Sequence, residues 1–165
     1  MNNKDLVILC NLRSDSRMQL TQMSKRTGIP VSTLHERIAR QDYIKRFTIV
    51  ADFARFGFDT KVHALLCVKQ EDKDAVKEHL LNSPYVNTLC RINNGYDYLL
   101  EAYFCNLAQV EAFFEHLEKN YKIRSKVIHY ILEEIAQEAF LSRPSHADWA
   151  SGRGSGHNVK WIQMD

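Results

Sequence analysis

The stretch that decides the fold of the N-terminal part of the chain is LTQMSKRTGIPVSTLHERIAR, residues 20–40. Gly28 stands where a first short helix should end, because glycine accepts the left-handed conformation that closes a helix. Pro30 is compatible with the start of a helix but not with its interior, so a second helix is expected from Val31 to Gln41. Two short helices joined by a turn that contains glycine predict a helix-turn-helix.

The second of these helices has two different faces. Leu34 and Ile38 lie four residues apart and are expected to face the core. The opposite face carries polar side chains suited to hydrogen bonds with phosphates and base edges in the major groove of DNA. The candidate DNA-binding residues are Ser32, Thr33, His35, Glu36, Arg37 and Arg40. The competing interpretation is a small three-helix bundle whose polar face is merely solvated.

Charge is distributed unevenly along the chain. Residues 1–51 contain nine Lys or Arg and four Asp or Glu, a net charge of +5, whereas residues 52–165 contain 13 and 16, a net charge of −3. A basic first third favours a polyanionic partner for the N-terminal part. The chain has no apolar run near the ~20 residues of a membrane-spanning helix. Because its first residues also lack the pattern of a signal peptide, a cytoplasmic protein without membrane contact is expected.

The rest of the chain predicts strands and helices in a particular order. A strand is expected at 43–50. After it, strands are expected at 62–68, 86–93, 98–104 and 127–132, with helices at 72–81 and 107–121. The order β-α-β-β-α-β is the ferredoxin-like arrangement, a four-stranded sheet with both helices on one face. The predicted fold class is therefore α+β, with a winged-type helix-turn-helix bundle followed by a ferredoxin-like domain.

The domain boundaries follow from these elements. The expected division is a helix-turn-helix domain at 1–51, a linker at 52–60, a ferredoxin-like oligomerisation and effector domain at 61–141, and a polar tail at 142–165. In the tail, the apolar segment 159–162 is expected either to dock on a neighbour or to be disordered. Apolar residues occur on both faces of the predicted sheet, so a second subunit should cover the face without helices. The residues assigned to that open face are Leu65, Leu89, Leu99, Tyr103, Ile128 and Tyr130.

No metal site, cofactor or catalytic residue is expected from the sequence. The four cysteines form no C-x-x-C pair and are interpreted as small buried hydrophobic residues without disulfides; they are Cys10, Cys67, Cys90 and Cys105. There is no Ser/His/Asp order, no glycine-rich phosphate loop, no metal-ligand spacing and no clustering of histidines along the sequence. The chain is therefore not expected to be an enzyme.

Two stretches resemble a known family. Residues 20–38 look much like the helix-turn-helix of the Lrp/AsnC (leucine-responsive regulator/asparagine regulator) family, and NGYDYLL, residues 94–100, looks like the turn of that family's effector domain. The resemblance covers about residues 4–133. Asn94 stands where the family has a turn glycine, but asparagine also tolerates a positive φ. The tail after Leu141 is not part of the family pattern.

The resemblance implies a transcription regulator that forms a homodimer through its α+β domains, with dimers often assembled into octamers. It also implies an amino-acid or related small effector near the turn, where Asn94, Gly95, Tyr96 and Asp97 would line the site by position. A carboxylate beside free backbone N–H groups is suited to an amino acid, although Asp97 could instead simply cap the turn. Two DNA-contacting helices related by a two-fold axis predict an inverted-repeat site on double-stranded DNA.

Two other functions stay open at this point. The first is a ligand-sensing or assembly module whose helical domain does not bind DNA. The second is an enzyme similar to the haem-pathway decarboxylases, which have a similar two-part architecture. The polar, partly basic face of the 31–41 helix argues against the first, and the lack of a catalytic motif argues against the second.

Overall fold

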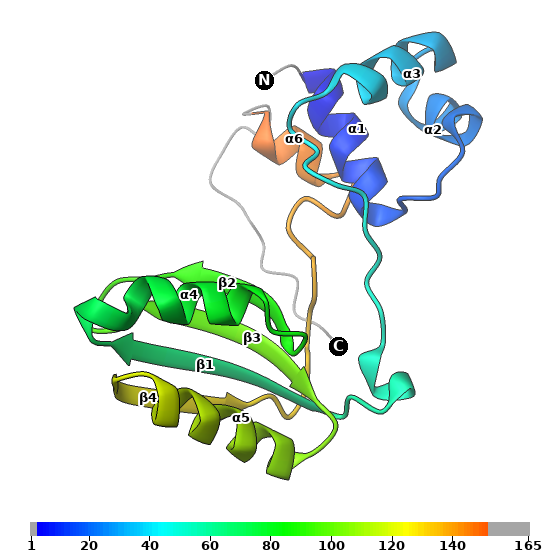
Figure 1. The fold of residues 1–165 in the computed structure, drawn as a ribbon. Helices are drawn as coiled ribbons and strands as arrows, with labels where there is room; N and C mark the ends of the chain where they lie inside the picture. The colour runs from blue at the N-terminus through cyan, green and yellow to red at the C-terminus, as the bar shows by residue number, and fades with distance from the viewer. Residues whose placement is uncertain (1–2, 152–165) are drawn as a thin grey trace. The chain divides into compact units, whose positions relative to one another are not determined.

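The computed structural model describes residues 3–151, which form two compact units (Figure 1). The first unit contains the chain up to Val50 and the segment that begins at Ala136, and the second is Ala51–Ile135. The apolar segment 159–162 of the predicted tail lies outside the described residues. Within residues 3–151, no helix is long and apolar enough to cross a membrane.

The first unit is built on three helices, α1 (Asn3–Ser14), α2 (Leu20–Thr27) and α3 (Val31–Arg40). As predicted, Gly28 closes α2 with a φ of 69°, and its N–H donates to the carbonyl of Ser24 at 2.9 Å. Ile8, Met23 and Leu34, one from each helix, are fully buried together at the centre of this unit. The predicted helix-turn-helix is confirmed.

The strand expected at 43–50 is not formed. Residues 44–50 are in neither a helix nor a strand, and the side chains of Phe47, Ile49 and Val50 are exposed. β-Branched and aromatic residues favour a strand only where a neighbouring strand and a packed surface receive them. Because the four-stranded sheet described below does not include this segment, the local preference is not realised within the described chain.

The segment that follows the second unit packs on α1. It leads into a short helix, α6 (His146–Ala150), and buries Leu141 and Ala147 against Leu6 and Cys10. This packing differs from the expected domain division, which assigned residues up to 141 to the ferredoxin-like domain and left 142–151 in a polar tail. Local composition suggested a solvated segment, but the side chains of Leu141 and Ala147 pack against an apolar strip on α1.

Hydrogen bonds hold the same segment on the C-terminal end of α1. The guanidinium of Arg13 donates to the backbone carbonyl of Phe140 at 2.6 Å and to that of Glu138 at 2.9 Å. It also pairs with the carboxylate of Glu138 at 2.6 Å. The Arg13 side chain thus fixes the backbone of the segment directly before the buried Leu141.

The second unit has the predicted ferredoxin-like order. Its elements are β1 (Thr60–Val68), α4 (Lys73–Leu81), β2 (Val86–Arg91), β3 (Tyr98–Phe104), α5 (Leu107–Asn120) and β4 (Ile123–Tyr130), with short 3₁₀ helices η1 (Phe53–Phe56) and η2 (Gln70–Asp72). The strands pair antiparallel in the order β2-β3-β1-β4, and Figure 1 shows α4 and α5 on the same face of the sheet. Alternate residues of β1, from Val62 to Val68, are buried on the helix side.

Strand register corrects the residues assigned to the open face. Leu65 lies opposite Leu99 on β3 and Val127 on β4, so these three share the face without helices. Leu89 and Ile128, by contrast, pair with Leu100 and Ala64 and pack against the helix-side core. Tyr130 pairs with the buried Val62 and so lies on the helix side too. The predicted set was wrong at three positions because strands alternate their faces, and β2 and β4 were placed one residue out of phase.

The expectation of buried cysteines holds for one of the four. Cys10 is buried in α1 and Cys67 is partly buried, but Cys90 and Cys105 are exposed. Cys90 lies on the edge strand β2 and pairs with Leu99, which places it on the open face. Cys105 follows the last residue of β3. Burial was wrong for these two because an edge and a strand end provide less cover than a central strand.

We expect Leu141→Ala to destabilise the first unit, because the mutation removes most of a buried side chain that packs against Leu6 and Cys10 of α1. The loss should be about 2 kcal/mol of unfolding free energy. Hydrogen exchange of the α1 amides measures it at the affected element. Phe140→Ala is the control, since that neighbouring side chain is 70% exposed and its carbonyl, which Arg13 uses, is retained. Equal protection of α1 in both variants would contradict the packing role of Leu141.

Candidate DNA-binding face and effector turn

Helix α3 presents one outer face, because Leu34 is buried and Ile38 packs beside it. At about 100° per residue, the side opposite Leu34 carries Ser32, His35, Glu36 and Arg40. These four predicted residues are exposed. The hydroxyl, imidazole, carboxylate and guanidinium therefore share one accessible surface, with the donors and acceptors that contacts to base edges and phosphates require.

Ala39 also belongs to this outer face and was not among the predicted residues. It is exposed and lies between His35 and Arg40 along the helix surface. An alanine has no polar group, so the polar pattern of the sequence carries no signal for it. Alanine is nonetheless among the residues that make apolar contacts with thymine methyl groups in major grooves.

An ion pair on the outer face joins Glu36 and Arg40. The two charged groups are 2.7 Å apart, one helical turn from each other, and their side chains are 58% and 79% exposed. Such exposed pairs contribute roughly 0.3–0.5 kcal/mol. Arg40 can therefore leave Glu36 for a phosphate or a base at little cost in free energy.

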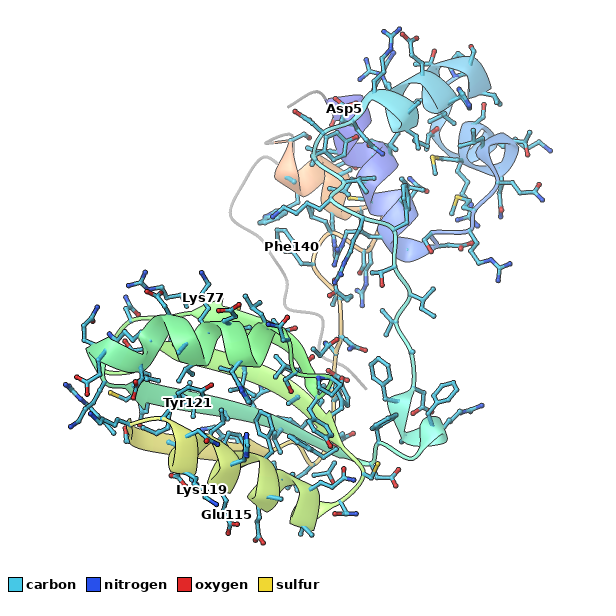
Figure 2. The ribbon with its side chains drawn as sticks, viewed as in Figure 1. Asp5, Lys77, Glu115, Lys119, Tyr121 and Phe140 are labelled. Atoms are coloured by element: carbon cyan, nitrogen blue, oxygen red, sulfur yellow. The ribbon has the colours of Figure 1, made fainter. Side chains whose placement is uncertain are left out.

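Arg37 is placed differently from the other predicted residues. Its guanidinium lies 2.6 Å from the carboxylate of Asp5 on α1, and both side chains are largely shielded, at 30% and 20% exposed. Figure 2 labels Asp5 near the beginning of the chain, on α1. The side chain of Thr33 is also only partly exposed to solvent. Arg37 thus connects the two helices, and its position in this structure is that of a residue that orients α3.

The turn predicted to line an effector site is formed as expected. Asn94 has a φ of 64° and Gly95 a φ of 90°, so asparagine adopts the positive φ that the family pattern gives to glycine. The backbone N–H of Ile92 donates to the carbonyl of Asp97 at 3.0 Å and closes the loop. Asn94 and Gly95 are exposed, whereas Tyr96 and Asp97 are partly buried.

Asp97 is the most strongly bonded residue of this turn. Its carboxylate lies 2.5 Å from the ammonium of Lys73 and accepts the backbone N–H of Val68 at 2.8 Å. Burial by itself would raise the pKa of the Asp97 carboxyl, but the Lys73 and Val68 hydrogen bonds outweigh it and hold this pKa below its usual value. The ionised carboxylate thus ties the turn to the end of β1 and the start of α4. This geometry corresponds to the alternative interpretation, in which Asp97 stabilises the turn.

Models of two protein families match the chain. Residues 1–40 match a family described as winged helix-turn-helix DNA-binding, and residues 63–140 match the Lrp/AsnC ligand binding domain. The two matches fall on the two halves of the structure, on α1–α3 and on the ferredoxin-like sheet with its helices.

Relatives and solved structures agree with these matches. An HTH-type transcriptional regulator, FL11, of Pyrococcus furiosus is 27% identical over 118 residues, which is 70% of this chain and 78% of that protein. LrpC of Bacillus subtilis is 24% identical over 134 residues, 79% of this chain and 91% of LrpC. Its solved structure superposes with a TM-score of 0.73 over 83% of this chain and 98% of its own. A transcriptional regulator of Neisseria meningitidis, solved as its L-Met complex, is similar in fold, with a TM-score of 0.76, 15% identity and coverage of 83% and 93%.

A double-mutant cycle on Asp5 and Arg37 tests the orienting role. We expect Asp5→Ala and Arg37→Ala to share a coupling free energy of roughly 1 kcal/mol, because the pair is shielded from water and joins two helices. The matched control is the exposed pair Glu36 and Arg40, whose coupling should be smaller. Urea unfolding of all variants measures both values. A coupling for Asp5 and Arg37 no larger than that of the control pair would show that the contact does not position α3.

Proposed function

The chain belongs to the Lrp/AsnC family of transcription regulators, and on that premise we propose that it binds an inverted-repeat DNA site as a homodimer and responds to an amino-acid effector. Its architecture is a helix-turn-helix DNA-binding domain joined to an Lrp/AsnC ligand-binding domain. The observation that carries the proposal is the outer face of α3, where exposed polar residues lie together in the basic part of the chain.

Specific roles on this face follow from exposure. Arg40 and Ser32 contact phosphates or base edges, and His35 and Glu36 flank them. Ala39 contributes a methyl group to the same surface. Arg37 and Thr33, which are partly buried, act from the side of the helix, with Arg37 holding α3 against Asp5. These roles are separated by exposure because a side chain that reaches a base edge must extend from the exposed side of the helix.

The open face of the sheet is the proposed dimer surface. Leu65, Leu99 and Val127 form an apolar centre there, on three adjacent strands. Burying such a centre against the same face of a second subunit removes apolar area from water and generates a two-fold axis. That axis pairs two copies of α3, as an inverted-repeat site requires. Assembly of dimers into an octamer rests on the family resemblance alone.

Charged groups on the same face are already paired within the chain. Glu101 lies 2.8 Å from the ammonium of Lys61 and 3.1 Å from Nε2 of His63, and it accepts an N–H from the Asn87 amide. Burial raises the pKa of Glu101, but these hydrogen bonds, with Lys61 first, lower it below its usual value overall. A polar group with satisfied hydrogen bonds costs less to bury, so this network does not oppose dimer formation.

The effector would bind at the turn of Asn94, Gly95, Tyr96 and Asp97. Two exposed residues with positive φ present backbone groups to an incoming ligand. Because Lys73 neutralises Asp97, the ammonium of an amino acid would share this carboxylate with Lys73 or displace it. The carboxylate of the amino acid would then have Lys73 as a partner. Support for an amino-acid effector comes from the similar Neisseria meningitidis regulator, solved with L-Met.

Regulation, rather than catalysis, is the proposed activity, in line with relatives named as transcriptional regulators. A DNA-binding regulator acts where the DNA lies. In the bacteria and archaea that supply the named relatives, that compartment is the cytoplasm.

The first experiment selects binding sites from randomised duplex DNA and then titrates the enriched sequence by fluorescence anisotropy. We expect an inverted repeat and a steep decrease of affinity with salt, because phosphate contacts release counterions. Arg40→Ala should weaken binding to the enriched site by about 1–3 kcal/mol. Titrations with and without an amino-acid panel then test the effector.

Arg55→Ala is the matched control for Arg40→Ala. Arg55 is also a solvent-exposed arginine in a short-range ion pair, 3.1 Å from Asp52, but it belongs to the second unit. Its loss removes the same charge and should leave the affinity nearly unchanged. Equal weakening by both variants would show general electrostatic attraction instead of a contact by α3. If no sequence is enriched with any amino acid present, the proposed specific binding is wrong.

For the dimer, we expect Leu65→Glu to shift the protein to a monomer in sedimentation velocity, because a carboxylate would be buried without a partner at the centre of the open face. The control Leu81→Glu places the same charge on α4, at a leucine that is 63% exposed. It should leave the dimer intact. A Leu65→Glu protein that sediments like the wild type would move the interface to another surface.

A further inference from the structure

A hollow of about 750 Å³ lies between α4 and α5 on the helix side of the sheet, away from the effector turn. Its apolar lining includes Phe113, Tyr85 and Ala75. The hollow is also lined by one histidine from each helix, His79 of α4 and His116 of α5, and by Tyr121. Figure 2 labels Tyr121, which follows the end of α5. No role in DNA binding or dimer formation uses these groups.

The two histidines are spaced as two ligands of one metal ion. His79 of α4 and His116 of α5 have ring centroids 5.6 Å apart and planes tilted by 31°. When two imidazole nitrogens bind one Zn²⁺ at ~2.0–2.1 Å in a tetrahedral arrangement, their ring centroids lie roughly 5–5.5 Å apart. The observed centroid separation of 5.6 Å is therefore compatible with both imidazoles binding one ion after a small adjustment of the side chains.

Tyr121 fixes the orientation of the first ligand. Its hydroxyl lies 3.4 Å from Nδ1 of His79, and its ring meets the imidazole edge-on at 5.6 Å. In the tautomer with the proton on Nδ1, this N–H donates to the hydroxyl oxygen, and the lone pair on Nε2 is available to a metal. Metal-binding histidines commonly donate their second N–H to such a partner.

The surroundings of His116 differ from those of His79. His116 is more exposed, and the amide of Asn120, one turn later, lies beside its ring at 3.2–3.4 Å while donating to the His116 carbonyl at 2.7 Å. Because this hydrogen bond holds the amide beside the ring, metal binding at His116 requires the Asn120 side chain to turn away.

We propose that His79 and His116 bind a divalent transition-metal ion such as Zn²⁺ or Ni²⁺ and so bridge α4 and α5, with Tyr121 as a positioning residue. Imidazole nitrogen is a ligand that both ions accept. Within residues 3–151, no cluster of three or more His, Cys, Asp or Glu side chains is arranged for a metal ion. The protein thus supplies two ligands, water completes the coordination, and the affinity is lower than that of a closed four-ligand site.

Isothermal titration calorimetry with Zn²⁺ and with Ni²⁺ tests the site on full-length protein without a polyhistidine tag. We expect one ion per chain and a higher melting temperature when the ion is present, because binding stabilises the folded state. His79→Asn and His116→Asn should each abolish this binding, and Tyr121→Phe should weaken it by about ten-fold or more. Circular dichroism and the metal-free melting temperature verify that the variants fold.

Two controls locate the site. His35→Ala removes an exposed histidine of α3, and His129→Ala disrupts the competing pair of His63 and His129, which stand opposite each other on β1 and β4. Both should retain the wild-type affinity. Selective broadening of the His79 and His116 imidazole resonances by Ni²⁺ would support the bridge. Unchanged binding in the His79 and His116 variants, or no binding by the wild type, would overturn it.

Discussion

The structure of the DNA-binding unit depends on α1, which is packed on two sides. One side buries Ile8 with Met23 and Leu34 of the helix-turn-helix. The other buries Leu6 and Cys10 under the returning segment, with Arg13 bonded to its backbone. Helix α1 therefore packs both against the helix-turn-helix and against the segment that follows the second unit. Any change in the returning segment has a direct packing route to α1, because close-packed side chains transmit displacement.

Polar interactions in this unit differ in what they stabilise. The pair of Asp5 and Arg37 is shielded from water and joins two helices, so it restricts how α3 lies on α1. The pair of Glu36 and Arg40 is exposed and lies within one helix, so it restricts almost nothing and leaves Arg40 available. Two arginines only three positions apart on α3 thus have different surroundings, since Arg37 is bonded to another helix and Arg40 is exposed to solvent.

The second unit shows a similar separation between support and availability. Asp97 is bonded to Lys73 and Val68 and holds the turn in place, while Asn94 and Gly95 remain exposed at its tip. On the open face, Glu101 satisfies Lys61, His63 and Asn87 around an apolar centre. Both arrangements hold exposed groups in place through bonds within the chain, and such preorganisation lowers the ordering cost of any binding at these surfaces.

Local patterns in the sequence determined the helix-turn-helix, the β-α-β-β-α-β order and the positive φ at Asn94, because each depends on neighbours within a few residues. Exposed polar positions on α3 were also predictable from helical periodicity. Tertiary structure alone decided the rest: the pairing of Arg37 with Asp5, the docking of Leu141 on α1, the absence of a strand at 44–50, and the meeting of His79 with His116. Each of these depends on residues distant in the chain, and whether a charge is paired or an apolar side chain covered depends on a partner that the local pattern does not contain.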